Sequence, residues 1–509
     1  MRSVFAMSRT LGSPARAGET RPRRRRRPAP RRWVVADATM GPVSATADTA
    51  GPRYDERMSD VDALVWAVER DPRLRSTVSA VAVLDGPLDR LELWRRLDRA
   101  SRRIPRLRQR VVPDPYGIAP PRWEIDPDFR LAAHVRITGF GGRGTDDDLH
   151  RLAAAVTTVP FDRARPLWEF TLVEGLTGDR TALVMKTHHA VTDGVGGVQL
   201  MLEIFDLEPH PDDPRRELPP EPEPDPPRSE PERVLDAVAH EARRAAGALE
   251  SLVGRALGVG DPVNAARHAG ETAASLGRLL APAPEPLSPI MTGRSGDLAF
   301  AAFDVPLTDL KAAGHRIGGT VNDAFVAGVL AGVAAYHGAS DAPVERLRLS
   351  IPLNRRRPGD TTVGNRWTPA RAVLRCDIDD PDELMRHVHE TVDRLRREPA
   401  QDLLDPLAGV LRLAPAPVAT SLFAAASRGV DVAASNVPGS PVPLWLLGRR
   451  LTALVPFGPL SGCAANITLL SIAGTAHIGV VVDPAAVPDV GVFTRHLRDG
   501  FSRVVDGRR

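Results

Sequence analysis

The stretch KTHHAVTDGVGG, residues 186–197, places two adjacent histidines and an Asp-Gly pair between two patterned segments. TALVMKTHH at 181–189 predicts a β-strand, and WEFTLVEGL at 168–176 predicts a second strand joined to it by a short TGDR turn. GVQLMLEIFDL at 197–207 predicts an apolar helix directly after the glycines. The histidine pair therefore marks the point at which a strand passes into a helix.

Two further segments extend this unit toward the N-terminus. TVSAVAVLDG at 77–86 is strand-like and ends in an Asp-Gly turn signal. LDRLELWRRLDRASRRIP at 88–105 carries an apolar helical stripe and stops at Pro105. We therefore expect residues 58–207 to form one compact α/β domain.

The composition changes after this unit. Residues 208–232 are rich in proline and acidic residues, which is typical of an extended, solvated linker. Apolar residues spaced by three and four then predict an amphipathic helix from Leu235 to about residue 257. Together with the Pro-rich stretch 281–289, the whole segment 208–296 is expected to connect two domains rather than to form a core.

Residues 297–509 return to an α/β pattern and are expected to form a second domain. Thr320 and Asp323 have the spacing of a capping box at the start of a helix. The expected strands are 299–307, 347–353 and 467–483, the last of which folds back at an Ala-Gly-Thr turn, and the expected helices are 320–337 and 487–505.

Length and composition agree with two domains. The chain has 509 residues, which exceeds one ordinary hydrophobic core. Its two cysteines, Cys376 and Cys463, exclude a disulfide framework and favour a reducing, cytosolic setting. The longest apolar run, 324–336, has 13 residues and is too short to span a bilayer, so any membrane contact should be peripheral.

The positive charge of the chain is confined to its N-terminus. Residues 1–57 carry 13 Arg against 5 acidic residues, whereas the remainder carries 54 basic and 59 acidic residues. An arginine run can contact nucleic acid or anionic lipid. The absence of any periodicity favours a disordered tail, with Met40 and Met58 as alternative starts, and we predict no nucleic-acid partner.

The histidine pair suggests proton transfer by a single imidazole. Successive side chains of a strand point to opposite faces, so His188 and His189 cannot both enter one cavity if the strand continues through them. An imidazole titrates near neutral pH and can take a proton from an alcohol that attacks a carbonyl. Asp193 can hold an imidazole or fix the turn, and the glycines let the backbone bend or a substrate pass.

Other interpretations of the pair have less support. A zinc site needs a third ligand, and adjacent histidines lack the H-x-x-x-H spacing of a helical metal pair. The chain has no G-x-S-x-G elbow, no Walker A loop and no G-x-G-x-x-G opening a helix. Two structural histidines beside an ordinary Asp-Gly turn remain an alternative.

HHAVTDG matches the H-H-x-x-x-D-G motif of CoA-dependent acyltransferases and condensation domains, and further segments narrow the resemblance. Together, over about residues 58–505, they resemble the bacterial wax ester synthase/diacylglycerol acyltransferase family. GRSGDLAF at 293–300 differs from the sequence that this family usually has at this point, which leaves the choice of acceptor alcohol open. The segments are MSDVDALVW (58–66), IPRLRQRV (104–111), RPLWEFTLVEGL (165–176), HHAVTDG (188–194), TVNDAFVAGV (320–329), GNRWTPARAVL (364–374), SNVPG (435–439), GPLSGCAANIT (458–468) and VVDPAAVPD (481–489).

The resemblance implies a fold and a reaction. The fold is α+β, with two chloramphenicol-acetyltransferase-like domains, mixed sheets and a channel between them. The reaction moves a long-chain acyl group from acyl-CoA to diacylglycerol or a fatty alcohol. His189 would be the general base, His188 and Asp193 would position it, and Gly194 would keep the channel open. Acyl-CoA is a co-substrate, and no metal or redox cofactor is implied.

Three further residues are substrate-binding candidates by resemblance. Trp168 would line an acyl passage, although it also suits an ordinary strand start. Asn322 also suits a simple helix cap, and Asn466 is either a polar strand-edge residue or a donor to a carbonyl oxygen. The arginines of IPRLRQRV are expected on a solvated face.

Two alternative functions remain open from the sequence. One is an acyltransferase that esterifies a polyketide or another secondary metabolite, and the other is a non-catalytic protein of lipid-inclusion surfaces. The expected location is the cytoplasm, with peripheral attachment to the inner membrane or to lipid inclusions.

Overall fold

The computed structural model describes residues 53–191, 194–211, 218–257, 285–354, 362–363, 367–397, 420–421, 424, 427 and 429–508. Asp193 and the predicted tail up to residue 52 lie outside these ranges. Residues 53–57 already belong to the fold, because Tyr54 pairs with Val363 and the Arg57 guanidinium donates to the Pro120 carbonyl at 2.6 Å. The folded part therefore begins ahead of Met58, where the sequence pattern placed its start.

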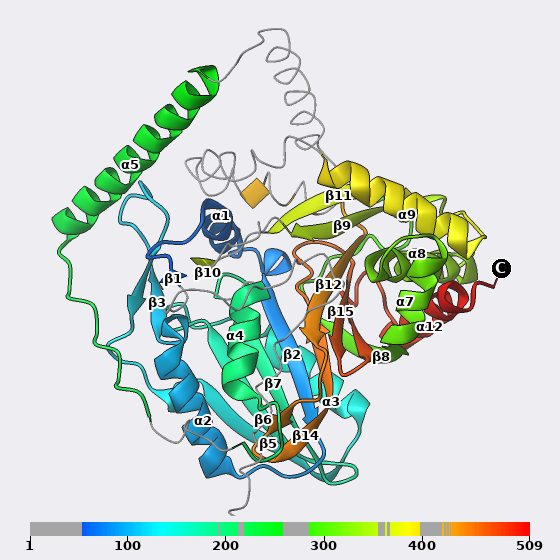
Figure 1. The fold of residues 1–509 in the computed structure, drawn as a ribbon, viewed down its shortest axis with the longest axis horizontal. Coiled ribbons are helices and arrows are strands. Elements are labelled where there is room, and N and C mark those ends of the chain that lie inside the picture. Colours follow the sequence, from blue (N-terminus) through cyan, green and yellow to red (C-terminus); the bar gives the residue numbers. More distant parts are fainter. Residues whose placement is uncertain are drawn as a thin grey trace, which may run out of the picture.

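Two six-stranded sheets form the two halves of the molecule (Figure 1). Both are mixed, since β5 runs parallel to β6 in the first sheet and β12 runs parallel to β9 and β15 in the second. In spatial order the first sheet consists of β13 (Trp445–Leu446), β14 (Arg449–Phe457), β2 (Thr77–Leu84), β7 (Arg180–His188), β6 (Trp168–Leu176) and β5 (Val135–Gly144). The second consists of β11 (Trp367–Arg375), β9 (Arg346–Asn354), β12 (Val432–Ser440), β15 (Ala465–Ile472), β16 (Thr475–Val482) and β8 (Ala299–Pro306).

The C-terminal half completes the sheet of the N-terminal half. Strands β13 and β14 come from residues 445–457, and β14 pairs antiparallel with β2. A smaller exchange runs the other way, because β1 (Arg53–Tyr54) pairs with β10 (Thr362–Val363). A two-stranded ribbon of β3 (Gln109–Val112) and β4 (Arg122–Ile125) lies within the N-terminal half. The sequence did not predict either exchange, since both join strands that are hundreds of residues apart.

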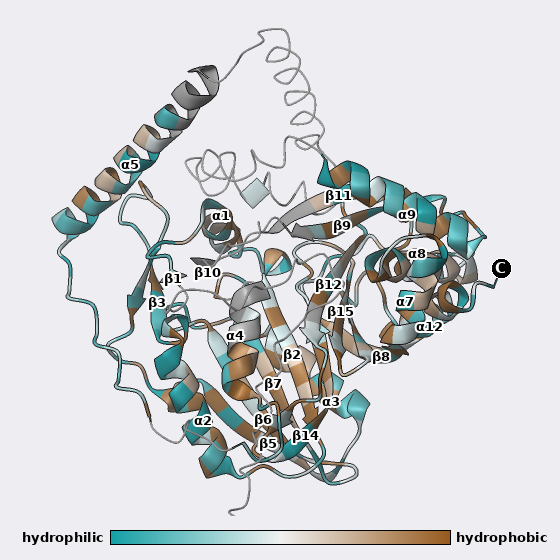
Figure 2. Ribbon diagram, in the orientation of Figure 1, coloured by the Kyte–Doolittle hydropathy of each residue, from teal (hydrophilic) through white to brown (hydrophobic). Residues whose placement is uncertain are grey.

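Helices cover the sheets on their apolar faces, and the strands carry most of the apolar colour in Figure 2. Helices α2 and α4 share one core cluster with the N-terminal sheet, whereas α3 packs on its other face with residues of β8. Helices α7, α8, α9 and α12 contribute to the core of the C-terminal half. The described helices are α1 (Asp60–Val68), α2 (Arg90–Arg103), α3 (Asp146–Thr158), α4 (Gly194–Ile204), α5 (Glu230–Leu257), α7 (Leu307–Arg316), α8 (Val321–Ala339), α9 (Pro381–Arg396) and α12 (Val490–Asp506).

Helix α8 is the centre of the C-terminal core. It begins with the predicted capping box of Thr320 and Asp323. A Cβ on Gly332 would lie 2.5 Å from the Leu497 Cα of α12, so the two helices approach at a distance that only glycine permits. In the part of the chain that the structure describes, no single helix has the length and apolar composition to cross a bilayer. Helices α7 and α8 have that length and composition only when taken together, and a bend of 95° separates them.

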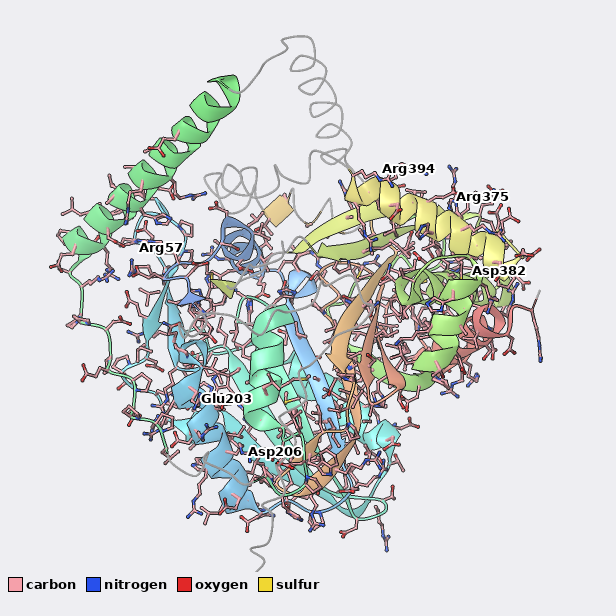
Figure 3. All side chains as sticks on the ribbon, in the orientation of Figure 1. Arg57, Glu203, Asp206, Arg375, Asp382 and Arg394 are labelled. Atoms are coloured by element: carbon pink, nitrogen blue, oxygen red, sulfur yellow. The ribbon has the colours of Figure 1, made fainter. Side chains whose placement is uncertain are left out.

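The connection between the halves runs along the outside of the N-terminal half. Residues 218–229 form neither helix nor strand, as the Pro-rich composition predicted. They are nevertheless held in place, because Glu221 pairs with buried Arg108 and the Asp225 carboxylate accepts the Ile125 N–H at 2.7 Å. Helix α5 then lies along the outer edge of the molecule (Figures 1 and 3), where Asp236 pairs with Arg57, which Figure 3 labels.

Candidate active site

The histidine pair lies where β7 ends. His188 is the last residue of the strand and pairs with Thr77, the first residue of β2. His189 lies in the turn that follows, and its backbone N–H donates to the Ser76 carbonyl at 2.9 Å. The strand therefore stops one residue before the sequence predicted. Helix α4 begins at Gly194, three residues earlier than predicted, so its N-terminal end lies next to the pair in the chain.

His188 is a buried residue that protein groups hold on several sides. Its side chain is 1% exposed, and its Nδ1 accepts the Ala190 backbone N–H at 3.0 Å. The rings of Trp66 and Phe161 meet it edge to face at centroid distances of 5.5 and 6.4 Å. Because Nδ1 is an acceptor here, we assign the proton of the neutral ring to Nε2.

The second ring nitrogen of His188 lies close to a carboxylate that no sequence motif singles out. The Nε2 atom lies 2.9 Å from Oε2 of Glu69, within the distance of an ion pair but without the alignment of a hydrogen bond. Glu69 caps the C-terminal end of α1, is 8% exposed, and accepts the Ser76 backbone N–H through Oε1. Its place before Arg70 and Asp71 is typical of an ordinary helix end, so only the fold reveals it.

His189 is surrounded by protein but keeps part of its surface exposed. Burial, assisted by the neighbouring His188, lowers the pKa of its imidazole to about 4, and a hydrogen bond to its own backbone together with Glu69 opposes this shift. A backbone group that favours the protonated ring must be a carbonyl acceptor.

Trp168 is enclosed in the N-terminal core. Its side chain is 1% exposed, its Nε1–H donates to the Leu107 carbonyl at 2.7 Å, and its ring stacks on His134 at 4.7 Å. These contacts give it a packing role. Contact between Trp168 and a substrate stays a prediction.

The two asparagine candidates lie in the C-terminal half. Asn322 is half-buried in the first turn of α8, next to Asp323, whose carboxylate accepts the Thr320 N–H at 2.7 Å. Asn466 on β15 donates to the Pro459 carbonyl at 2.7 Å and accepts from the Thr468 hydroxyl at 2.8 Å. Asn466 thus holds the loop after β14 in place, and a substrate role for either asparagine stays a prediction.

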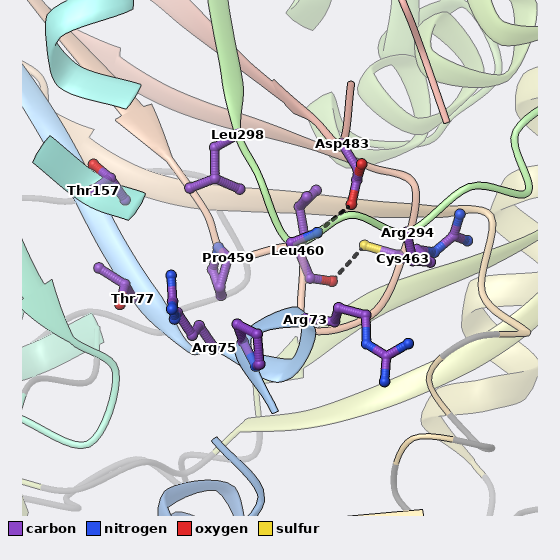
Figure 4. Close-up of a pocket in the computed structure, with 12 residues that line it drawn as sticks. Arg73, Arg75, Thr77, Thr157, Arg294, Leu298, Pro459, Leu460, Cys463 and Asp483 are labelled. Atoms are coloured by element: carbon purple, nitrogen blue, oxygen red, sulfur yellow. Dashed lines mark hydrogen bonds between the residues drawn. The ribbon is translucent and has the colours of Figure 1, made fainter. Parts of the chain in front are cut away.

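A pocket opens between the halves, and residues of both halves line it (Figure 4). Thr77, the strand partner of His188, lies on its wall, and the loop that Asn466 holds forms another part of it. Burial raises the pKa of the Cys463 thiol in this wall to about 12, so that thiol is no nucleophile near neutral pH. The lining residues are Pro72, Arg73, Arg75, Thr77, Thr157, Arg294, Gly296, Leu298, Pro459, Leu460, Cys463 and Asp483.

Within the described ranges, no three His, Cys, Asp or Glu side chains gather in a way that would hold a metal ion. The fold brings together His188, His189 and Glu69, and Gly194 lies at the start of the helix that follows them. Asp193 belongs to the two residues of this loop outside the described structure.

Family models match both halves of the chain. The model described as wax ester synthase/diacylglycerol acyltransferase catalytic domain matches residues 58–325, and that of the WS/DGAT C-terminal domain matches residues 363–504. The chain belongs to the wax ester synthase/diacylglycerol acyltransferase family. The resemblance predicted from the ordered motifs is thereby confirmed.

Relatives of known sequence support this membership. A Mycobacterium tuberculosis protein named as a diacylglycerol O-acyltransferase is 36% identical over 460 residues, which cover 89% of this chain and 92% of the relative. A second M. tuberculosis protein with the same designation is 27% identical over 455 residues, covering 86% of this chain and 93% of the other.

Solved structures confirm the predicted fold class. A wax ester synthase/diacylglycerol acyltransferase from Marinobacter aquaeolei VT8 superimposes with a TM-score of 0.57 at 22% identity, covering 88% of this chain and 98% of that one. The first condensation domain of the calcium-dependent antibiotic synthetase gives a TM-score of 0.54 at 20% identity, covering 89% and 97%. The two halves with mixed sheets are thus the acyltransferase architecture that the resemblance implied.

Proposed function

We propose that this member of the family transfers a long-chain acyl group from acyl-CoA to the hydroxyl of diacylglycerol, of a long-chain alcohol, or of both. The observation that carries the proposal is the position of His189 in the turn after β7, where its backbone N–H donates to the Ser76 carbonyl and burial lowers the pKa of its imidazole to about 4. The 36% identity to a protein named as a diacylglycerol O-acyltransferase supports the acceptor class.

The reaction follows from the chemistry of a neutral imidazole. The imidazole of His189 accepts the proton of the acceptor hydroxyl while the hydroxyl oxygen attacks the thioester carbonyl carbon. The tetrahedral intermediate then expels the CoA sulfur, and the imidazolium returns its proton to the thiolate. The products are an ester and free CoA, and no redox change or additional cofactor is required.

The low pKa of His189 has an advantage and a cost. With a pKa of about 4, essentially every molecule carries the neutral, proton-accepting ring near pH 7. The cost is a weaker base, since proton transfer is most efficient when the pKa of the base lies near the working pH. Orientation of the hydroxyl against the thioester must therefore supply much of the acceleration, which suits a residue whose backbone N–H is held by the Ser76 carbonyl.

The test is one incubation of purified protein with palmitoyl-CoA and a panel of diacylglycerols, fatty alcohols and hydroxylated secondary metabolites. Released CoA thiol measures turnover, and chromatography identifies the ester. We expect thiol release that depends on a diacylglycerol or a fatty alcohol. Esterification of the secondary metabolites alone, or no release with any acceptor, would contradict the proposal.

We also propose that the protein works in the cytoplasm at the surface of the inner membrane or of lipid inclusions. Its proposed acceptors partition into lipid, and helix α5 exposes Leu235 and Val238 at 69% and 50% on the outer edge of the molecule. Changing both residues to serine should reduce co-flotation with vesicles that contain diacylglycerol. Undiminished flotation would argue against this surface.

A further inference from the structure

We propose that Glu69 is a positioning residue that holds both histidines of the pair, and this inference depends on the proposed function of His189. Glu69 comes from the end of α1, more than a hundred residues before the pair in the chain. Its two carboxylate oxygens contact two different groups, and each group leads to one histidine.

The first contact is direct. Oε2 of Glu69 lies 2.9 Å from Nε2 of His188, and both side chains are buried. The opposite ring nitrogen accepts the Ala190 N–H, so one end of the imidazole is hydrogen-bonded and the other lies beside the carboxylate. The N–H of Ala190 belongs to the residue after His189. The orientation of the His188 ring therefore fixes the backbone on the far side of the catalytic residue.

The second contact passes through one peptide unit. Oε1 of Glu69 accepts the Ser76 N–H, and the Ser76 carbonyl accepts the His189 N–H at 2.9 Å. The carboxylate thus fixes the residue that anchors the backbone of His189. With the first contact, Glu69 constrains the catalytic turn on both sides, at the N–H of His189 and at the N–H of Ala190.

The charge of Glu69 also acts on the base itself. It is one of the influences that raise the pKa of the His189 imidazole, in opposition to burial and to His188. A cation flanks the carboxylate, because Nη2 of Arg163 lies 3.7 Å from Oε2 and its guanidinium covers the Trp66 ring at 3.9 Å. Arg163 offsets part of the negative charge and holds the ring that packs against His188.

Glu69→Gln separates these effects. The amide oxygen still accepts the Ser76 N–H, but the amide NH₂ then faces the Nε2–H of His188, so two donors oppose each other. We expect kcat per folded molecule to fall by about 10- to 100-fold, the usual cost of losing a group that orients an active residue, with KM for palmitoyl-CoA nearly unchanged. Glu69→Asp should recover part of the loss because it restores the charge.

The matched control is Glu203→Gln. Glu203 is also a partly buried carboxylate of the N-terminal half, paired with Arg99 at 2.8 Å, and it lies at the far end of α4 from the catalytic turn. This variant should lower the melting temperature and leave kcat unchanged.

A second readout is the titration of His189 by NMR in protein with labelled histidines, assigned with the His189→Gln variant. Loss of the carboxylate should move the pKa of His189 below its wild-type value. If Glu69→Gln keeps both wild-type kcat and the wild-type titration, the positioning role is overturned, even when the melting temperature falls. Absence of turnover in the wild type would instead overturn the proposed function, and the titration would then decide the role of Glu69 by itself.

Discussion

Among the described residues, the N-terminal half buries cationic side chains, whereas the buried charged side chains of the C-terminal half are aspartates. Among the described residues, every buried arginine or lysine lies between residues 57 and 186. Arg96 pairs with Asp206 at 2.9 Å, and buried Lys186 lies 3.2 Å from Glu169 and 4.3 Å from the centre of the Phe161 ring. In the described part of the C-terminal half the buried titratable groups are histidines, aspartates and the two cysteines.

Each half is built on its own six-stranded sheet, so the difference in buried charge does not come from the architecture. Lys186 and His188 are two residues apart on β7 and face the same side of the sheet. Phe161 touches both side chains, which links the buried charge to the turn that carries His189. The comparison teaches that the half with the proposed catalytic histidine buries cations around that residue, while the other half contributes packing and the strand β14.

The largest expected effect is on turnover. His189→Ala should lower kcat by about 10²–10⁴-fold, the usual cost of removing a general base, with the melting temperature and acyl-CoA binding nearly unchanged. His188→Ala and Asp193→Asn should act more through stability and geometry, with a smaller loss per folded molecule. A dead but stable His188→Ala beside an active His189→Ala would reverse the assignment.

A histidine of the C-terminal half provides the matched control. His477 is 2% exposed, and its Nδ1 lies 2.7 Å from the Asp304 carboxylate, so it too is a buried ring beside an acidic group. His477→Ala should lower the melting temperature and leave kcat per folded molecule unchanged. A kinetic loss like that of His189→Ala would show that the chemistry is not confined to one half.

The second effect compares the two cores in stability. Asp206→Ala leaves buried Arg96 without its carboxylate, which should cost about 3–5 kcal/mol of unfolding free energy. Leu330→Ala in α8, where the side chain is fully buried, should cost a similar amount, roughly 2–5 kcal/mol, as large-to-small core substitutions do. Chemical denaturation measures both variants.

The double variant Arg96→Met, Asp206→Leu sharpens this comparison. Replacing a buried ion pair by apolar residues of similar volume is often neutral or stabilising. We therefore expect recovery of most of the stability that Asp206→Ala loses. If the double variant is also fully active, this pair is needed for neither stability nor catalysis. The buried charges that could affect the reaction are then those next to β7, such as Lys186 and Glu69.

Local patterns in the sequence predicted the elements well. The hairpin of β6 and β7, the pair β15 and β16, and helix α8 with its capping box lie where apolar period and turn residues placed them. A capping box depends on four neighbouring residues, and it was predicted correctly for that reason. The histidine motif likewise lies at the strand end that the pattern of residues 181–189 predicted, within one residue.

Long-range contacts could not be predicted in this way. The pairing of β14 with β2, and the approach of Glu69 to His188, depend on residues that no local pattern connects. Arg106 and Arg108 were expected on a solvated face, which is wrong: both are buried, with guanidinium groups over Trp123 at 4.2 Å and Phe129 at 4.4 Å. The sequence does not distinguish a buried arginine from an exposed one, because the aromatic rings that cover the buried guanidinium groups come from other parts of the chain.

The third prediction concerns pH. Burial disfavours the imidazolium of His189, so its pKa falls from 6.5 to about 4 and the neutral base persists well below neutral pH. The logarithm of kcat/KM should therefore be flat from pH 8 to about 6 and decline with unit slope only near pH 4. An acid limb at about 6.5 would indicate an unperturbed imidazole.

The free energy of unfolding also falls at acid pH, as kcat/KM does, so the two must be measured separately. The unfolded chain binds a proton to His189 at higher pH than the folded chain does. The stability from this group is therefore complete above pH 6.5 and is lost as pH falls through 4. Burial also lowers the pKa of His337 in the C-terminal half, so both halves contribute to acid unfolding. Returning samples to pH 7 before the assay separates unfolding from titration of the base.

The smallest effect concerns the edge of the N-terminal half, where two truncations differ by a few residues. A chain that begins at Gly51 keeps β1 and the Arg57 guanidinium, which contacts the Pro120 carbonyl at 2.6 Å and Asp236 at 2.5 Å. A chain that begins at Met58 loses both features. The first should match the full-length protein in melting temperature. The second should lose about 1.5–3 kcal/mol of unfolding free energy, the range for a hydrogen bond to a charged group.

Both truncated chains should retain the full-length kcat per folded molecule, because the partners of Arg57 and β1 are Pro120, Asp236 and β10 rather than the histidine pair. Thermal melts and thiol release on the same preparations check this expectation. Arg122 also pairs with Asp236, at 2.7 Å, so the chain from Met58 should still hold α5 and lose only part of that attachment. A chain from Met58 that melts like the full-length protein would show that the exchange of β1 with β10 contributes nothing measurable. A chain from Gly51 that loses turnover would instead give the arginine-rich tail a catalytic role and break the division between the two halves.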